Sequence, residues 1–235
     1  MNVTLTRVTE NPVQAVEEAA SNCYNSEPSE DGKIMKGCYK SGHWAVLEFA
    51  DFTFHIDGVS RALLAQLTRH RIASYAVRSQ RYCAENGFEY VTPPAIQNNV
   101  EALFCYTDIM KAIDKSYADL QSFGIKNEDA RFVLPNACDT ILEVKMNGRE
   151  LINFMNLRLC TRAQWEIRQL AHKMKKCVEE HNEQCAEFSK LFRPKCQIHA
   201  PFNFCTERNC CGMAPKLKDV YVAYLQSLEE GGSNE

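Results

Sequence analysis

The chain has 235 residues and a formal net charge of −3, from 27 basic and 30 acidic side chains. A chain of this length can bury about 70% of its unfolded surface in one domain, so we expect a fold that needs no disulfide or metal. The slight negative charge argues against general nucleic-acid binding, which normally uses a basic surface. The sequence has no apolar run of about 18 residues and no secretory signal in MNVTLTRVTENP, so we expect a cytoplasmic protein with no membrane partner.

Hydrophobic periodicity and turn residues predict a mixture of helices and strands. Asn11 and Pro12 suit the cap and first turn of a helix, and Asn147 with Glu150 resembles a capping box. In chain order we expect a helix at 11–21, a loop at 26–37, a strand at 46–56, a helix at 57–70, an extended loop at 74–90, a helix at 97–123, a short helix at 127–134, a strand at 140–146, a helix from 147, and a long helix at 163–192.

The remaining C-terminal part is predicted to be irregular from 193 to 215, with a disordered EEGGSNE at the end. The sequence contains 12 cysteines, whose scatter through a mid-sized chain predicts reduced, mostly buried thiols. Five potential metal ligands gather in the C-terminal part with the spacing C-x2-H-x5-C-x4-C-C: Cys196, His199, Cys205, Cys210 and Cys211. This spacing matches no common zinc motif, so we predict no metal there and keep zinc as the alternative.

A basic segment, RHRIASYAVRSQR, spans Arg69–Arg81. The apolar residues before it fall at helical spacing and would pack one face of a helix that carries Gln66: Val59, Leu63, Leu64 and Leu67. The basic residues could simply complement the dipole at the end of that helix. Arginine forks together with serine hydroxyls are nevertheless the usual equipment for binding phosphate, so we predict an anion site.

A second polar pattern lies on the helix expected from Asn147. Arg149, Asn153 and Asn156 are spaced i, i+4 and i+7, which places them on one face of that helix. This face could be solvated, or it could bind a heterocycle and its phosphate through amide donors and acceptors. The sequence contains neither GxGxxG nor a P-loop, so a dinucleotide would not bind in the Rossmann manner.

Together these segments resemble the flavin-dependent thymidylate synthases. The family signature is RHR followed after seven residues by Ser, and Arg69-His70-Arg71 with Ser79 matches it. Other matching blocks occur in the family's order, namely Gly42-His43, Glu48 and 52–55 upstream, and 130–135, Asn147-Gly148-Arg149, 153–158 and 163–167 downstream. The resemblance covers roughly residues 20–190 and marks 1–195 as the family domain, with 196–235 as a cysteine-containing extension that is not an independent domain.

The resemblance implies an α+β fold in a single domain, with a small antiparallel sheet flanked by several helices, including long ones. It implies a homotetramer with FAD bound between protomers. The implied reaction is the reductive methylation of dUMP to dTMP, in which methylenetetrahydrofolate supplies the carbon and NADPH reduces FAD. The expected partners are therefore dUMP and further copies of the chain, without nucleic acid.

The resemblance also assigns roles to individual residues. Arg158 and Ser79 would be catalytic, with Arg158 favouring an ionised uracil, and His43 would lie on the folate or NADPH side. The expected FAD-binding residues are Arg69, His70, Arg71, Ser74, Glu48, Asn147, Arg149, Asn153, Arg162 and Cys23. The expected dUMP-binding residues are Gln66, Arg69, Ser79, Gln80, Arg81, Arg131 and Arg158.

The chain departs from the family pattern at several positions. Ala76-Val77 replaces a common Asn-Glu pair, Arg162 stands where a His can occur, and Cys23 stands where Ser is found. The first departure motivates an alternative enzyme, which methylates or hydroxymethylates another pyrimidine nucleotide. A non-enzymatic nucleotide- or RNA-binding module is a further alternative. Cys138, which follows a Leu-Pro as the nucleophile of unrelated cysteine-dependent thymidylate synthases does, is expected to be a buried, inert thiol.

Overall fold

The computed structural model describes residues 1–199 and 202–231, including their side chains except those of 24 and 228–231. The chain forms two compact units. The first consists of Met1–Glu10 and Ala50–Asn147, and the second of Asn11–Phe49 and Gly148–Glu235. Because each unit combines two separate stretches of sequence, no single cut of the chain separates them.

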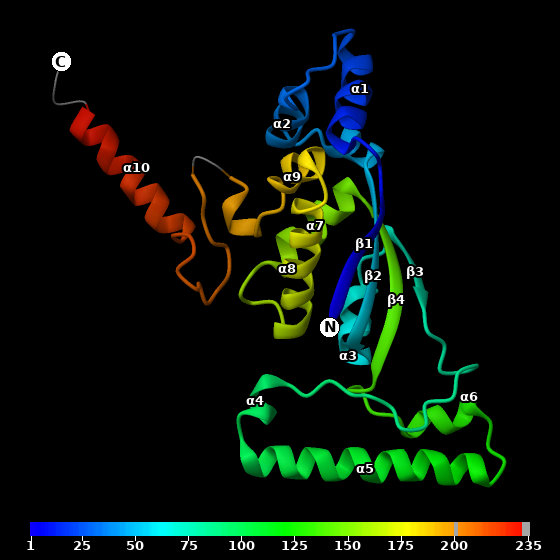
Figure 1. The fold of residues 1–235 in the computed structure, drawn as a ribbon. Coiled ribbons are helices and arrows are strands. Elements are labelled where there is room, and N and C mark those ends of the chain that lie inside the picture. The colour runs from blue at the N-terminus through cyan, green and yellow to red at the C-terminus, as the bar shows by residue number, and fades with distance from the viewer. Residues whose placement is uncertain (200–201, 232–235) are drawn as a thin grey trace. The chain divides into compact units, whose positions relative to one another are not determined.

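A four-stranded antiparallel sheet forms the centre of the first unit (Figure 1). The strands lie in the order β1 (Asn2–Val8), β2 (Asp51–Ser60), β4 (Asp139–Asn147) and β3 (Ala73–Val77). Side chains of β4 alternate between buried and solvent-facing positions, and Leu142, Val144 and Met146 are buried. This period of two is expected for a sheet with one face in the core.

Helix α3 (Arg61–Leu67) begins directly after β2. The Ser60 hydroxyl caps it by accepting a hydrogen bond from Leu63 N at 3.0 Å, which satisfies one of the free N–H groups of the first turn. Leu63 and Leu67 are fully buried. The helix is therefore fixed at both ends of its apolar face, and the basic segment that follows starts from a defined position.

The rest of the first unit is mainly helical. Its elements are α4 (Pro94–Gln97), α5 (Val100–Ser122), α6 (Asn127–Ala130) and the 3-10 turn η2 (Arg131–Val133). Asn99 caps α5 by accepting from Ala102 N at 3.0 Å. A small core of Phe88, Met110 and Cys138 packs this part together, and the Tyr106 hydroxyl donates to Val91 O at 2.8 Å beside it.

The second unit consists of helices. They are α1 (Pro12–Tyr24), α2 (Lys33–Lys40), η1 (Trp44–Phe49), α7 (Gly148–Arg158), α8 (Trp165–Glu179), α9 (Glu183–Ser189), η3 (Lys195–Gln197) and α10 (Leu217–Gly231). The fully buried Glu17 of α1 joins α1 to α2. Its carboxylate accepts from Met35 N at 2.7 Å and from Ser29 N and Oγ at 3.0 and 2.8 Å, so a buried charge is supplied with the donors it requires.

Helix α7 starts at a position that has no room for a side chain. A Cβ built on Gly148 would lie 2.6 Å from Leu47 O and 2.6 Å from Phe188 Cζ. The first turn of α7 therefore packs directly on the backbone of η1 and on an aromatic ring of α9. Any larger residue at this position would push these elements apart.

The α+β class and the small antiparallel sheet are confirmed, and several boundaries are corrected. Strand β3 replaces the first part of the loop expected at 74–90, and α2 lies partly within the loop expected at 26–37. The long helix expected at 163–192 is divided into α8 and α9, because Asn182 Oδ1 accepts from Cys185 N at 2.7 Å and caps a new helix. Strand β1 and helix α10 were not predicted. Helix α10 ends at Gly231, so the disorder predicted for EEGGSNE is wrong at 229–231, and the rest of that segment lies outside the described residues.

The packing at Gly148 predicts a specific loss of stability. Gly148→Ala should lower the free energy of unfolding by about 1–3 kcal/mol through overpacking. Each kcal/mol lost should lower the melting temperature by roughly 2–4 °C. Gly37→Ala is the matched control, because Gly37 lies within α2 and a Cβ there meets nothing within 4 Å. That variant should be neutral or more stable. Equal melting temperatures for the two variants would contradict the packing argument.

Candidate functional site

The basic segment begins where α3 ends. Arg69 and Arg71 are exposed, whereas His70 is 5% exposed. The Tyr75 hydroxyl lies 2.8 Å from both Leu67 O and His70 O, and it can donate to either carbonyl. This hydroxyl ties the turn to the end of the helix. The buried His70 and the tied backbone together direct the two arginines toward solvent.

Both of these guanidinium groups are available for a ligand. Within the part of the chain that the structure describes, neither Arg69 nor Arg71 has an ion pair or a side-chain hydrogen bond. Nearby, Gln66 is half-buried and donates weakly to Ala62 O at 3.4 Å, and Ser74 is exposed on β3. Two uncompensated cations on a rigid turn form an anion-binding arrangement.

The loop after β3 is held from its buried side. Arg61 Nη2 donates to Arg78 O at 2.8 Å, and Arg78 Nε lies 3.3 Å from Glu85 Oε1. Glu85 is buried, and burial raises the pKa of its carboxyl although Arg78 and Arg61 act in the opposite direction. Burial likewise lowers the pKa of Arg61. Neither Arg61 nor Glu85 was recognised in the sequence, because each contacts Arg78 from a distant position along the chain.

Of the residues predicted to bind dUMP, Ser79, Gln80 and Arg81 lie on this loop and Arg131 on η2, whereas Gln66 lies on α3, Arg69 just after it, and Arg158 on α7. The Ser79 hydroxyl accepts from Arg81 N at 3.2 Å, and Gln80 Nε2 lies 3.5 Å from Cys138 Sγ. Glu128 brings two of the predicted arginines together. Arg81 Nε donates to Glu128 Oε2 at 2.7 Å, and Arg131 Nε donates to Glu128 O at 3.1 Å.

Glu128 was missed by the sequence reasoning, and no local pattern marks it. The hydrogen bond from Arg81 lowers the pKa of its carboxyl, so Glu128 stays ionised beside the arginine. A shallow pocket of about 420 Å³ lies here, lined by Arg81, Tyr82, Lys126, Asn127 and Glu128. Most of its lining can donate hydrogen bonds, which suits an anionic group.

The predicted flavin-side residues of the second unit cluster on α7. Arg149 is exposed and forms an ion pair with Glu48 of 2.8 Å. The Asn153 amide donates to the Glu150 carboxylate at 3.2–3.3 Å. Asn156, in contrast, is only 7% exposed, so it does not continue the solvent-facing stripe. Asn147 is half-buried and lies in the first unit, at the end of β4.

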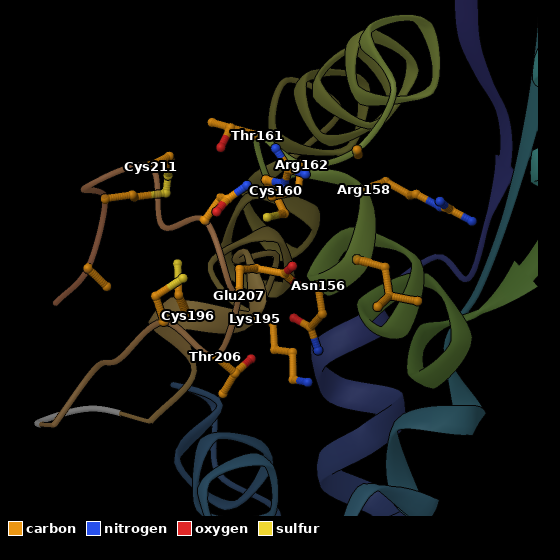
Figure 2. Close-up of a pocket in the computed structure, with 16 residues that line it drawn as sticks. Asn156, Arg158, Cys160, Thr161, Arg162, Lys195, Cys196, Thr206, Glu207 and Cys211 are labelled. Atoms are coloured by element: carbon orange, nitrogen blue, oxygen red, sulfur yellow. The ribbon is translucent and has the colours of Figure 1, made fainter. Parts of the chain in front are cut away.

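A pocket of about 290 Å³ lies at the C-terminal end of α7. It is lined by Asn156, Leu157, Arg158, Cys160, Thr161, Arg162, Ala163, Lys195, Cys196, Cys205, Thr206, Glu207, Asn209, Cys211, Met213 and Ala214. Figure 2 shows that the Arg158 side chain points away from Cys196 and Cys211. Arg158 is half-buried, and burial lowers the pKa of its guanidinium. A guanidinium in this state remains charged and incompletely hydrated.

Two further predicted residues lie in the N-terminal part of the second unit. His43 is exposed, and its backbone N–H donates to Cys38 O at 2.9 Å just before η1. Cys23 is exposed near the end of α1, with Sγ 3.6 Å from Ala19 O. The residues predicted to bind dUMP thus lie on the first unit, except Arg158, which lies on the second together with Glu48, Arg149, Asn153 and Arg162.

Cys138 is placed as expected. It is fully buried, and burial raises the pKa of its thiol to about 11. A thiol in this state is a poor nucleophile, because the thiolate is the reactive form. Among the described residues, no helix has the length and apolar character needed to span a membrane.

Comparisons with known proteins agree with this arrangement. The sequence model of the family described as thymidylate synthase complementing protein matches residues 4–182. The flavin-dependent thymidylate synthase of Clostridium tetani is 37% identical, over 94% of this chain and 97% of that protein. The enzyme of the same name from Geobacter sulfurreducens is 42% identical, over 76% of this chain and 82% of its own length.

A solved structure is also similar. The flavin-dependent thymidylate synthase of Helicobacter pylori, determined in complex with FAD and dUMP, superposes with a TM-score of 0.64 at 28% identity. The alignment covers 82% of this chain and 98% of that protein. Because the family model matches most of the chain and the Clostridium tetani enzyme is matched over 97% of its length, the chain belongs to the flavin-dependent thymidylate synthase family.

Proposed function

We propose that this protein methylates dUMP reductively to dTMP, with methylenetetrahydrofolate as the carbon donor and FAD, reduced by NADPH, as the hydride carrier. The observation that carries the proposal is the pair of exposed guanidinium groups of Arg69 and Arg71, which form no ion pair with any described residue, in the signature turn of a family to which the chain belongs. A solvated helix end would not require a buried histidine and a tyrosine hydroxyl to fix the turn that carries these cations.

The loop 78–82 and Arg131 would bind the phosphate and sugar of dUMP. Ser79 and Gln80 supply polar side chains, and Glu128 holds Arg81 and Arg131 at the same place. Arginine binds phosphate most strongly when its guanidinium group is already oriented before the ligand arrives, because less side-chain freedom is lost on binding. The buried support from Arg61 and Glu85 fixes the loop in the same way.

The donors suit a flavin dinucleotide. Arg69, Arg71 and Ser74 offer cations and a hydroxyl to its phosphates, His70 fixes their turn, and Asn147, Arg149 and Asn153 offer amide and guanidinium donors. We include Glu48, Arg162 and Cys23 in this site, with His43 on the folate or NADPH side. When bound and reduced, FAD supplies the hydride. The signature residues and the α7 residues belong to different units. We propose that the protein is a homotetramer in which the flavin sites are shared between protomers.

Arg158 would act on the base of dUMP. Its guanidinium is half-buried, so an anionic partner would be attracted more strongly than in water. Charge that develops on the uracil ring would be stabilised there, as at an oxyanion site. Ser79 would orient the nucleotide beside it. No thiol nucleophile is needed in this scheme, in keeping with the burial of Cys138.

Arg158→Ala tests the catalytic role. Loss of the charge should lower kcat by about 100- to 1,000-fold, as removal of one stabilising donor does elsewhere, while FAD remains bound. Turnover is measured as dTMP formation, and flavin content from the visible spectrum of the purified protein. Arg193→Ala is the control, since Arg193 is exposed and its side chain donates to the backbone carbonyl of Lys190 at 3.0 Å. Unchanged turnover in Arg158→Ala would refute the assignment.

Arg61→Ala tests the buried support of the loop. The variant loses the 2.8 Å hydrogen bond to Arg78 O, so the Kd of dUMP should rise by about tenfold, or about 1.4 kcal/mol. Isothermal titration with dUMP gives the value, and Arg61→Lys should restore part of it. Arg7→Ala, an exposed arginine of β1, should bind normally. A normal Kd in Arg61→Ala would show that the loop does not depend on this contact.

Cys138→Ala separates this scheme from one with a cysteine nucleophile. The variant should keep turnover within a few-fold of the parent, since the thiol is fully buried with a pKa of about 11. The small cavity left behind should cost about 1 kcal/mol of stability. Steady-state dTMP formation and a thermal melt measure both effects. A folded variant without activity would favour a nucleophilic thiol.

A further inference from the structure

Five thiols gather around the pocket at the end of α7, all within the second unit. Cys160, Cys196, Cys205 and Cys211 line it, and the charges of Cys160, Cys205 and Cys211 act on Cys196. Cys205 also forms a side-chain hydrogen bond with Cys210. Figure 2 shows Cys160, Cys196 and Cys211 around the same hollow. The proposed thymidylate synthase reaction uses none of these thiols.

Backbone N–H groups surround the sulfur atoms of the C-terminal segment. Gly212 N donates to Cys210 Sγ at 3.4 Å, and the backbones of Glu207 and Met213 donate to Cys205 and Cys211. Such donors favour the thiolate, because they stabilise its negative charge. Cys211 is exposed, and its pKa is lowered, first by a hydrogen bond with the Thr161 side chain and then by that backbone contact.

We propose that Cys211 is a site of thiol–disulfide exchange with small-molecule disulfides, and that Cys205 is the thiol that resolves the adduct into an internal disulfide. The proposal rests on the thiol cluster alone and does not depend on the proposed synthase function. In the reduced protein the cluster keeps an accessible attacking thiol next to a buried partner, which is the usual arrangement of a redox-sensitive cysteine and its resolving cysteine.

The exchange proceeds in two balanced steps. In the first, the Cys211 thiolate attacks one sulfur of the disulfide RS–SR. A mixed disulfide forms between Cys211 Sγ and one SR group, the original S–S bond of RS–SR breaks, and the other RS⁻ leaves and takes up a proton. In the second, the Cys205 thiol loses its proton to solvent and attacks Cys211 Sγ, and the second RS⁻ leaves. Two protein thiols are oxidised and RS–SR is reduced to two RSH.

Cys205 suits the second step better than Cys210 does. Residues 210 and 211 are adjacent, so their Cα atoms lie about 3.8 Å apart across a trans peptide, closer than the roughly 4.4–6.8 Å that disulfides span. The pKa of Cys205 is raised despite the backbone hydrogen bond from Glu207, because burial, Cys210 and Cys211 oppose its ionisation. When Cys211 forms the mixed disulfide, it no longer carries a thiolate charge that opposes ionisation of Cys205. The first step therefore favours the Cys205 thiolate that the second step requires.

A metal site would compete with this chemistry for the same thiols. Among the residues that the structure describes, no three His, Cys, Asp or Glu side chains are arranged to hold a metal ion. The thiols are therefore free to react, and all of them are reduced in the structure. The zinc alternative raised by the spacing in the sequence becomes an outcome of the experiment.

The test uses the full-length, fully reduced protein and oxidised glutathione, with peptide mapping by mass spectrometry over time. Cys211 should acquire the adduct about threefold or more faster than Cys105, because attack by a more ionised thiol is faster. Cys105 is the matched control, an exposed thiol on α5. The adduct should then give way to a Cys205–Cys211 disulfide that dithiothreitol reverses.

Two variants separate the steps. Cys205→Ser should accumulate the glutathione adduct at Cys211 without an internal disulfide, and Cys211→Ser should abolish that disulfide while Cys105 reacts as before. Equal rates at Cys211 and Cys105, or an internal disulfide formed as fast in Cys205→Ser as in the parent, would overturn the proposal. One zinc ion per chain in the purified protein, lost in Cys205→Ser, would also overturn it and would assign the cluster to metal binding.

Discussion

The absence of a side chain at Gly148 determines how the second unit is built. Leu47 O and the Phe188 ring occupy the space that a Cβ would need, at 2.6 Å from its position, so η1, α7 and α9 meet at a single point. The next residues in the chain after Leu47 and Gly148 are Glu48 and Arg149, which form an ion pair of 2.8 Å. Both belong to the proposed flavin site. Interiors are close-packed, so a displacement of one ångström there would be transmitted along α7 to Arg158.

In the first unit, a network of charged side chains supports the loop after β3. Arg61, Arg78 and Glu85 hold the nucleotide loop from beneath, and burial disfavours the charged forms of both Arg61 and Glu85. The ion pair joins the buried Glu85 to Arg78, whose side chain is 42% exposed, and such a pair adds little or nothing to stability compared with an apolar core. Its benefit here is geometric, because it fixes the backbone of Arg78 and directs the polar side chains of the loop, including Arg81, to one surface.

The sequence was informative wherever the periodicity was strong and the partners were local. It placed the signature at the end of a packed helix, and it predicted β4 to within about one residue at each end. Strand β3 was missed because ASYAV is short, and its pairing with β4 depends on a strand some 65 residues away. Glu128 and Glu85 were missed for the same reason, since a carboxylate that orients an arginine leaves no mark in the residues beside it. Helix α2 was missed because it is short and contains a glycine and three lysines.

The departure from the family at Ala76-Val77 has different consequences for its two residues. Both lie in β3 opposite β4, where Ala76 pairs with Glu143 and Val77 pairs with Leu142. Residues paired across antiparallel strands project from the same face of the sheet. On the face of Ala76, Glu143 keeps a carboxylate beside a groove of about 370 Å³ and contacts His55 at 2.7 Å. On the opposite face Leu142 is buried and offers no polar group, so the polarity lost at Val77 is not replaced across the strand.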